Sequence, residues 1–196
     1  MKIILASQSP RRKEFLTQMG LDFEVIVSDC EEILDENIDK NEVALHFACQ
    51  KAKDVFDKTT GDRMVIGCDS VVLINNQIYG KPKDYDDAFK MIKSYCGTCN
   101  YVISGLCVMV SKDDIVTTYK VSETSKVNVC QMSDEEIDAY IKTGEPFDKA
   151  GAYGLQGKFN IYVDSVEGNV SSIVGLPTNK LRDILRMENI KVFKNN

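Results

Sequence analysis

The chain of 196 residues has no tryptophan and a single histidine, His46. A histidine-based metal centre or catalytic triad therefore has little material to draw on. The sequence also has no apolar run close to the roughly 20 residues that a membrane-spanning helix needs. Residues 1–6 hold one lysine and a short apolar stretch, too little for a signal peptide. We expect a cytoplasmic protein with no membrane partner.

Positive charge is in deficit, with 24 Lys and Arg against 30 Asp and Glu and a net charge of −6. This balance argues against a nucleic acid polymer as partner, although a few placed cations can still bind a small phosphate ligand. The seven cysteines lie mostly in apolar runs, which is typical of reduced thiols in a cytosol. The pair Cys96 and Cys99 follows a predicted helix instead of opening one, which disfavours a redox or zinc role.

Hydrophobic patterning predicts one domain over residues 1–196. Helices are expected after Ser9, across 41–57, after Asp84, after Ser133 and across 181–185. Strands are expected at 2–5, 22–27, 64–74, 77–79, 101–110, 115–130, 160–163 and 169–174. Because hairpins and crossovers are mixed, the fold class is α/β, with a mixed twisted sheet flanked by helices.

The start of the first helix carries positive charge where the helix dipole disfavours it. Ser9 suits the N-cap and Pro10 the first helical position, and the cations Arg11, Arg12 and Lys13 follow at once. This arrangement costs stability unless an anion binds at the free N–H groups. A phosphate site is the favoured interpretation, and a solvated basic turn is the alternative.

Asp69 lies in the middle of the apolar run 64–74. An unpaired carboxylate buried there would cost several kcal/mol, so it needs a cation, a metal or a cleft. A functional Asp69 would hold a divalent metal, activate water, or do both. The alternative is a structural aspartate bonded to backbone at a bulge beside Gly67.

Two lysines and a loop complete the candidate site. Lys51 falls on the inward face of its helix, and Lys81 lies on a turn between Gly80 and Pro82. Each alone could be a solvated lysine, but with Arg11 and Arg12 they would outweigh the charge of a triphosphate. The glycine-rich loop 148–157 lacks the spacing of a P-loop, and its Gln156 could read the edge of a base.

In this order, the motifs resemble the Maf family of nucleoside triphosphate pyrophosphatases over nearly the whole chain. The matching segments are 5–12, Glu32, 50–52, 66–70, 80–82, 144–146, 148–157 and 174–177. The resemblance implies a fold with a central cleft, akin to the inosine triphosphatase group and often dimeric. It also implies hydrolysis between the α- and β-phosphates, yielding a nucleoside monophosphate and pyrophosphate, with Mg²⁺ or Mn²⁺ as cofactor.

The same resemblance implies residue roles. Asp69 matches the catalytic proton acceptor, and Asp69 with Glu32 would hold the metal. The positions that meet phosphate or metal are Ser7, Ser9, Arg12, Glu32, Lys51 and Lys81. The positions tied to substrate choice in the subgroup acting on dTTP and UTP are Arg11, Ser70 and Gln156, with Ser70 replacing the usual threonine.

Two other functions stay open from the sequence. One is a pyrophosphatase for modified or non-standard nucleotides. The other is a nucleotide-binding regulator, for instance of cell division, that binds without turnover. The presence of Asp69, Glu32 and Lys81 together favours an enzyme, because binding alone needs no water-activating carboxylate.

Overall fold

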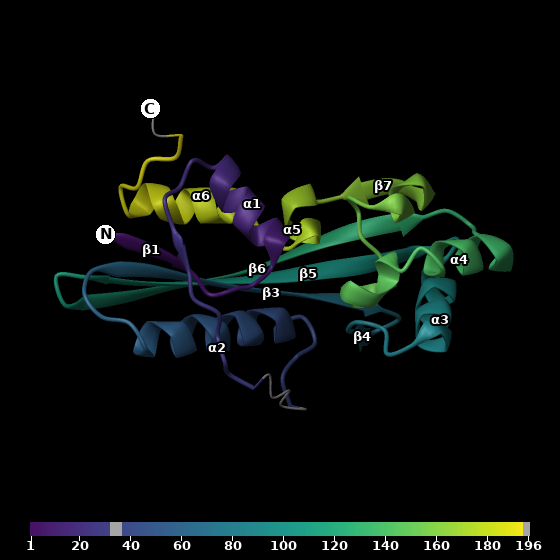
Figure 1. The fold of residues 1–196 in the computed structure, drawn as a ribbon, viewed down its shortest axis with the longest axis horizontal. Coiled ribbons are helices and arrows are strands. Elements are labelled where there is room, and N and C mark those ends of the chain that lie inside the picture. Colours follow the sequence, from purple (N-terminus) through teal and green to yellow (C-terminus); the bar gives the residue numbers. More distant parts are fainter. Residues whose placement is uncertain (32–36, 194–196) are drawn as a thin grey trace. The chain divides into compact units, whose positions relative to one another are not determined.

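The computed structural model describes residues 1–31 and 37–193. The strands and helices in these ranges follow one another as β1 (Lys2–Leu5), α1 (Pro10–Gln18), β2 (Glu24–Val25), α2 (Val43–Asp57), β3 (Arg63–Ile74), β4 (Gln77–Tyr79), α3 (Tyr85–Tyr95), β5 (Cys99–Lys112), β6 (Ile115–Val129), α4 (Asp134–Ile141), β7 (Val163–Glu167), α5 (Val170–Val174) and α6 (Thr178–Met187) (Figure 1). Three 3-10 turns lie between α4 and β7, at η1 (Glu145–Asp148), η2 (Ala150–Ala152) and η3 (Lys158–Tyr162). None of the helices in the described ranges is long and apolar enough to cross a membrane.

The described strands form one seven-stranded sheet in the order β2-β1-β3-β5-β6-β7, with β4 paired to β3. Strand β1 runs parallel to β2 and to β3, with Leu5 opposite Val25 and Ile66. The pairs β3–β4 and β6–β7 are antiparallel. The mixed sheet flanked by helices that the sequence predicted is therefore confirmed.

The chain divides into two compact units. Unit 1 comprises residues 1–69, 104–123 and 175–196, and unit 2 comprises residues 70–103 and 124–174. In unit 1, Leu5 packs on the sheet face covered by α1 and α6, and Ile4 packs on the face covered by α2 (Figure 1). Unit 2 has its own core, built around Tyr95 and Phe159. That these units act as a single domain stays a prediction.

Two glycines let α2 lie directly against the sheet of unit 1. A Cβ atom on Gly67 of β3 would lie 2.3 Å from the carbonyl oxygen of Ala48, and one on Gly105 of β5 would lie 2.4 Å from the backbone of Ala44. Any larger residue at either position would push the helix away. This contact sets the position of α2, and therefore of Lys51, relative to β3.

Most predicted turns and caps are confirmed. Asn75 and Asn76 both adopt positive φ in the β3–β4 hairpin. Ser133 and Glu136 form the expected capping box, and the Asp84 side chain caps α3.

Two predicted strands are wrong, and a third is shorter than expected. Residues 158–162 form η3, because Phe159 is buried among aromatic rings of unit 2, and the strand begins only at Val163. Residues 170–174 form α5, because the Asn169 side chain accepts hydrogen bonds from the backbone N–H and hydroxyl of Ser171 and so caps a helix. Of the strand expected at 22–27, only Glu24–Val25 pairs.

Candidate functional site

The turn between β1 and α1 supports the prediction of an anion site. Ser9 occupies the N-cap position of α1, but its side chain makes no capping hydrogen bond in the described structure. Its backbone N–H instead donates to the hydroxyl of buried Ser7, at 3.2 Å. The first N–H groups of α1 therefore have no side-chain cap from Ser9, which suits them to bind a phosphate oxygen.

Arg12 connects this turn to a distant part of unit 1. Its Nε donates to the carbonyl oxygen of Gly175 at 2.9 Å, and its Nη1 donates to Ser7 Oγ at 3.0 Å. Within the described residues these bonds use two of the five guanidinium N–H donors, so others can bind an anion. Arg11 and Lys13 flank Arg12 and are half-buried. Arg12 therefore does not belong to a freely solvated basic turn.

Asp69 has the cation that its burial requires. Lys51 Nζ lies 2.6 Å from Asp69 Oδ1, and the two side chains are 16% and 15% exposed. The apolar face of α2 packs through Ala48 and Ala52, which brings Lys51 against β3. An ammonium and a carboxylate in contact, each slightly open to solvent, form a pair that can meet a charged substrate.

The Arg12 turn and the Lys51–Asp69 pair belong to one electrostatic neighbourhood. The charges of both act on the buried thiol of Cys68 on β3. Burial raises the pKa of this thiol to about 11, the charges of Arg12 and Lys51 lower it, and that of Asp69 raises it. The thiol of Cys68 therefore stays uncharged at neutral pH, and Ser7, Arg12, Lys51 and Asp69 all belong to unit 1.

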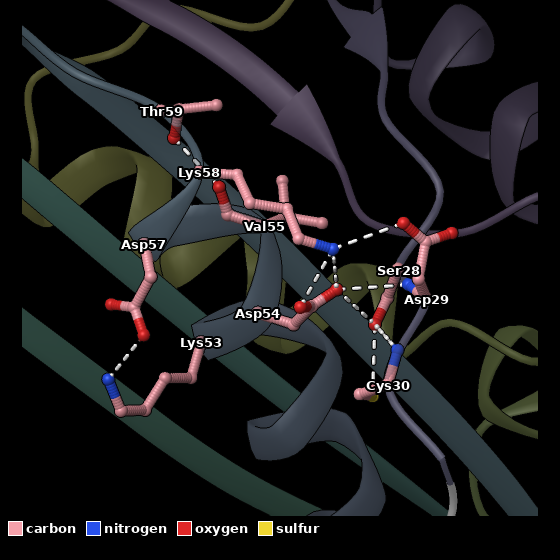
Figure 2. A network of polar contacts seen from close by, with 9 residues as sticks. All are labelled: Ser28, Asp29, Cys30, Lys53, Asp54, Val55, Asp57, Lys58 and Thr59. Carbon is pink, nitrogen blue, oxygen red and sulfur yellow. Dashed lines mark hydrogen bonds and ion pairs between the residues drawn. The ribbon is translucent and has the colours of Figure 1, made fainter.

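A polar network attaches residues 28–30 to α2 (Figure 2). The hydroxyl of Ser28 and the backbone N–H of Asp29 donate to Asp54 Oδ2, at 2.9 and 3.0 Å. Lys58 pairs with Asp54 at 2.9 Å and with Asp29 at 3.1 Å. The hydrogen bond from Lys58, followed by that from Ser28, holds the pKa of Asp54 below its usual value.

One predicted metal ligand, Glu32, lies outside the described residues, so its role stays a prediction. Asp54 lies three residues after Lys51 on α2. Sequence reasoning missed Asp54, although the i, i+4 spacing of Asp54 and Lys58 was a visible signal of an ion pair.

In unit 2, the turn that carries Lys81 is joined to the glycine-rich loop. The carbonyl oxygen of Gly80 accepts a hydrogen bond from Gly151 N–H at 2.9 Å, and Gly151 has a φ of 70°. Pro82 is buried while Lys81 is exposed. The structure therefore fixes the backbone of this turn and leaves its ammonium accessible.

The glycine-rich loop is held by the core of unit 2. Tyr95 OH donates to the carbonyl oxygen of Gly151 at 3.0 Å, and Tyr153 OH donates to Asn100 Oδ1 at 2.7 Å. Gln156 is exposed, and Ser70 is half-buried on β3. A rigid loop with an exposed amide can offer a donor and an acceptor to a base.

The His, Cys, Asp and Glu side chains of the described residues offer few ligands to a divalent metal. Residues 1–31 and 37–193 contain no group of three or more His, Cys, Asp or Glu arranged to hold one. Mg²⁺ is usually bound by one or two carboxylates together with substrate phosphates. The carboxylate of Asp69 fits that pattern, as one protein ligand of a metal shared with the substrate.

Comparison with known proteins identifies the family of the chain. The family model described as Maf-like protein matches residues 2–188. A protein of Alkaliphilus oremlandii named dTTP/UTP pyrophosphatase is 46% identical over 94% of this chain and 95% of its own length. A protein of the same name from Acetivibrio thermocellus is 43% identical over 98% of both chains.

A solved structure from Mycobacterium abscessus, titled nucleoside-triphosphatase / dITP/XTP pyrophosphatase, covers 96% of both chains. Its TM-score is 0.44 and its sequence identity is 13%. The family model covers residues 2–188, and the two relatives named above are 46% and 43% identical. The family-model match and the two dTTP/UTP pyrophosphatase relatives show that the chain belongs to the Maf family.

Proposed function

We propose that this protein hydrolyses nucleoside triphosphates, foremost dTTP and UTP, to a nucleoside monophosphate and pyrophosphate. The Lys51–Asp69 contact of 2.6 Å carries the proposal, because it sets a carboxylate that is partly open to solvent against an ammonium, and their charges act with that of Arg12 on the same thiol, Cys68. The names of the relatives support the substrates. Modified pyrimidine nucleotides are further candidate substrates, and clearing the nucleotide pool of unwanted triphosphates would be the cellular role.

The phosphates are bound by cations and by the start of α1. Ser7, Ser9 and Arg12 form the turn that receives phosphate oxygens, while Lys51 and Lys81 neutralise charge. Asp69 accepts a proton from the attacking water, whose oxygen adds to the α-phosphorus as pyrophosphate leaves. Lys51 holds the Asp69 carboxylate in place through its hydrogen bond to Oδ1. Mg²⁺ or Mn²⁺, held by Asp69 and Glu32, would neutralise phosphate charge when bound.

Base choice is assigned to Gln156, Arg11 and Ser70. A glutamine amide presents one acceptor and two donors, which match the alternating acceptor and donor groups of a uracil or thymine edge. The exposure of Gln156 supports this role. The cytoplasmic location and the homodimer belong to the same proposal, and size-exclusion chromatography with light scattering tests the dimer.

The deciding experiment measures pyrophosphate release by the purified protein with Mg²⁺ or Mn²⁺, and with EDTA. The substrates are dTTP, UTP, CTP, GTP, ITP, 7-methyl-GTP and modified pyrimidine triphosphates. Asp69→Asn should lose turnover while keeping its circular dichroism spectrum. Asp57→Asn is the matched control, because Asp57 is an exposed aspartate on α2 paired with Lys53.

The outcomes separate the candidate functions. Metal-dependent release led by dTTP and UTP, absent in Asp69→Asn, supports the proposal. Release led by ITP or 7-methyl-GTP would overturn the substrate assignment. Nucleotide binding without release from any substrate would favour a regulator.

A further inference from the structure

Glu145 lies at the start of η1, directly after Gly144, and its carboxylate contacts the turn that carries Gln156. Oε2 accepts the backbone N–H of Lys158 at 2.8 Å, and Oε1 accepts the hydroxyl of Tyr140 at 3.1 Å. A Cβ atom on Gly157 would lie 2.0 Å from Glu145 Oε1. Gly157 is therefore the residue that lets the carboxylate approach the turn this closely.

Tyr140 extends this contact to the other end of the turn. The backbone N–H of Gly154 acts on its oxygen and lowers the pKa of the phenol. Burial, followed by the charge of Glu145, raises the pKa of Tyr140, so the phenol stays protonated and donates to the carboxylate. Glu145 thus reaches Lys158 directly and Gly154 through Tyr140.

Two further hydrogen bonds hold the backbone of the turn. Gly157 N–H donates to the carbonyl oxygen of Gly154 at 3.1 Å, and Asn160 Nδ2 donates to that of Leu155 at 2.9 Å. Gln156 is the exposed residue in the middle of this turn. Its backbone can therefore move little unless the Glu145 contacts break, while its amide stays accessible.

We infer that Glu145 is a positioning residue for base selection, which holds the turn 154–158 so that Gln156 presents its amide in one orientation. This inference rests on the proposed function and names a determinant of its specificity. Glu145 does not itself read the base, because both of its carboxylate oxygens are hydrogen-bonded within unit 2. Loss of orientation should weaken recognition of the base more than the chemical step, since Asp69 and Lys51 are untouched.

The test compares kcat and KM for UTP and CTP in wild type, Glu145→Ala, Gln156→Ala and the double variant. Glu145→Ala should raise KM for UTP at least about 10-fold with kcat within about 3-fold. The UTP/CTP ratio of kcat/KM should fall about 10-fold in each single variant. It should fall no further in the double variant, because both changes remove the same recognition.

Two further variants separate positioning from general stability. Glu136→Ala removes a matched bond, in which a carboxylate accepts the backbone N–H of Ser133 at 2.8 Å. It should lower Tm without changing the UTP/CTP ratio. Tyr140→Phe removes the hydroxyl that donates to Glu145 Oε1 and keeps the bond from Lys158 N–H to Oε2. It should lower the ratio about 3-fold, which decides the matter if Glu145→Ala does not fold.

The inference is overturned if Glu145→Ala and Tyr140→Phe both keep the wild-type ratio, or if the losses in the double variant add. It is equally overturned if Glu136→Ala loses discrimination to the same extent. A wild-type protein that releases no pyrophosphate from any nucleotide would instead overturn the proposed function, so the two failures are distinguishable.

Discussion

Lys51 Nζ lies 2.6 Å from Asp69 Oδ1 across the contact between α2 and β3. Gly67, two residues before Asp69, is what permits this contact, because a Cβ there would meet the carbonyl oxygen of Ala48. The ammonium compensates the carboxylate, and its charge acts with that of Arg12 on the thiol of Cys68. Lys51 therefore has two roles: it compensates the buried charge of Asp69 on β3, and it belongs to the proposed site of phosphate hydrolysis.

Lys51→Met keeps an unbranched side chain that reaches as far as Cε and removes the ammonium group. We expect kcat/KM for UTP to fall at least about 100-fold, because a cation directed at the phosphates and at Asp69 is lost. The matched control is Lys53→Met, since Lys53 is 67% exposed on the same helix and pairs with Asp57. Steady-state kinetics test both variants, and a Lys51→Met enzyme within 3-fold of wild type would contradict the assignment.

Arg12→Lys tests the connection from α1 to Gly175. A lysine keeps the charge but cannot reproduce the two separate bonds to Gly175 and Ser7. Loss of about 1 kcal/mol of hydrogen bonding should lower Tm by about 2–4 °C, and kcat/KM should fall at least about 10-fold. Arg182→Lys, at an exposed arginine of α6 paired with Asp183, should change neither quantity. If both variants changed Tm and kcat/KM equally, the bonds of Arg12 to Gly175 and Ser7 would have no specific role in stability or activity.

Much of this site could be predicted because burial leaves a charged residue few choices. A carboxylate inside an apolar strand must find a cation, and Lys51 on an inward helix face is that cation. Local chemistry also predicted the caps at Asp84 and Ser133, since an N-cap needs only neighbouring residues.

The remaining features depend on contacts that no local pattern contains. The partner of Arg12 is a backbone carbonyl 163 residues away. Every residue has a backbone carbonyl, so the sequence does not indicate which one Arg12 contacts. Glu145 lies in the segment 144–146 that carries part of the family resemblance, but no local pattern predicts that Gly157 lies against its carboxylate. The β-branched residues near 170–174 predict a strand. The Asn169 side chain accepts the N–H of Ser171 and stabilises the start of a helix there instead.

Asp54→Asn should lower stability in a pH-dependent way. The folded pKa of Asp54 lies below its unfolded value, so its contribution is fully present above the unfolded pKa of about 3.9 and is lost as pH falls through the folded pKa. Asparagine can still accept the bonds from Ser28 and Asp29, so the variant removes mainly the pairing with Lys58. Urea midpoints of the two proteins should differ by the same amount at pH 7 and pH 5.5, and the difference should shrink as pH falls below about 4. A constant difference would contradict this account.

Cys49 should be the most reactive thiol near neutral pH among those whose pKa is shifted. A hydrogen bond from the thiol of Cys107 on β5 is the main cause that lowers the pKa of Cys49, against the effect of burial and with a smaller contribution from Lys120. Burial is the main cause that raises the pKa of Cys96 and of Cys130. Since the thiolate is the nucleophile, alkylation of half-buried Cys49 should set in at a lower pH than alkylation of Cys96 or Cys130.

The partner thiol provides the control for this prediction. Cys107→Ala removes the donor, so the pKa of Cys49 should rise and its alkylation at pH 7 should slow several-fold, while Cys107→Ser keeps a donor and should preserve most of the rate. Iodoacetamide labelling followed by peptide mass spectrometry measures each site separately. If Cys49 reacts no faster than Cys96 at pH 7, or if the two Cys107 variants behave alike, the hydrogen bond does not control this thiol.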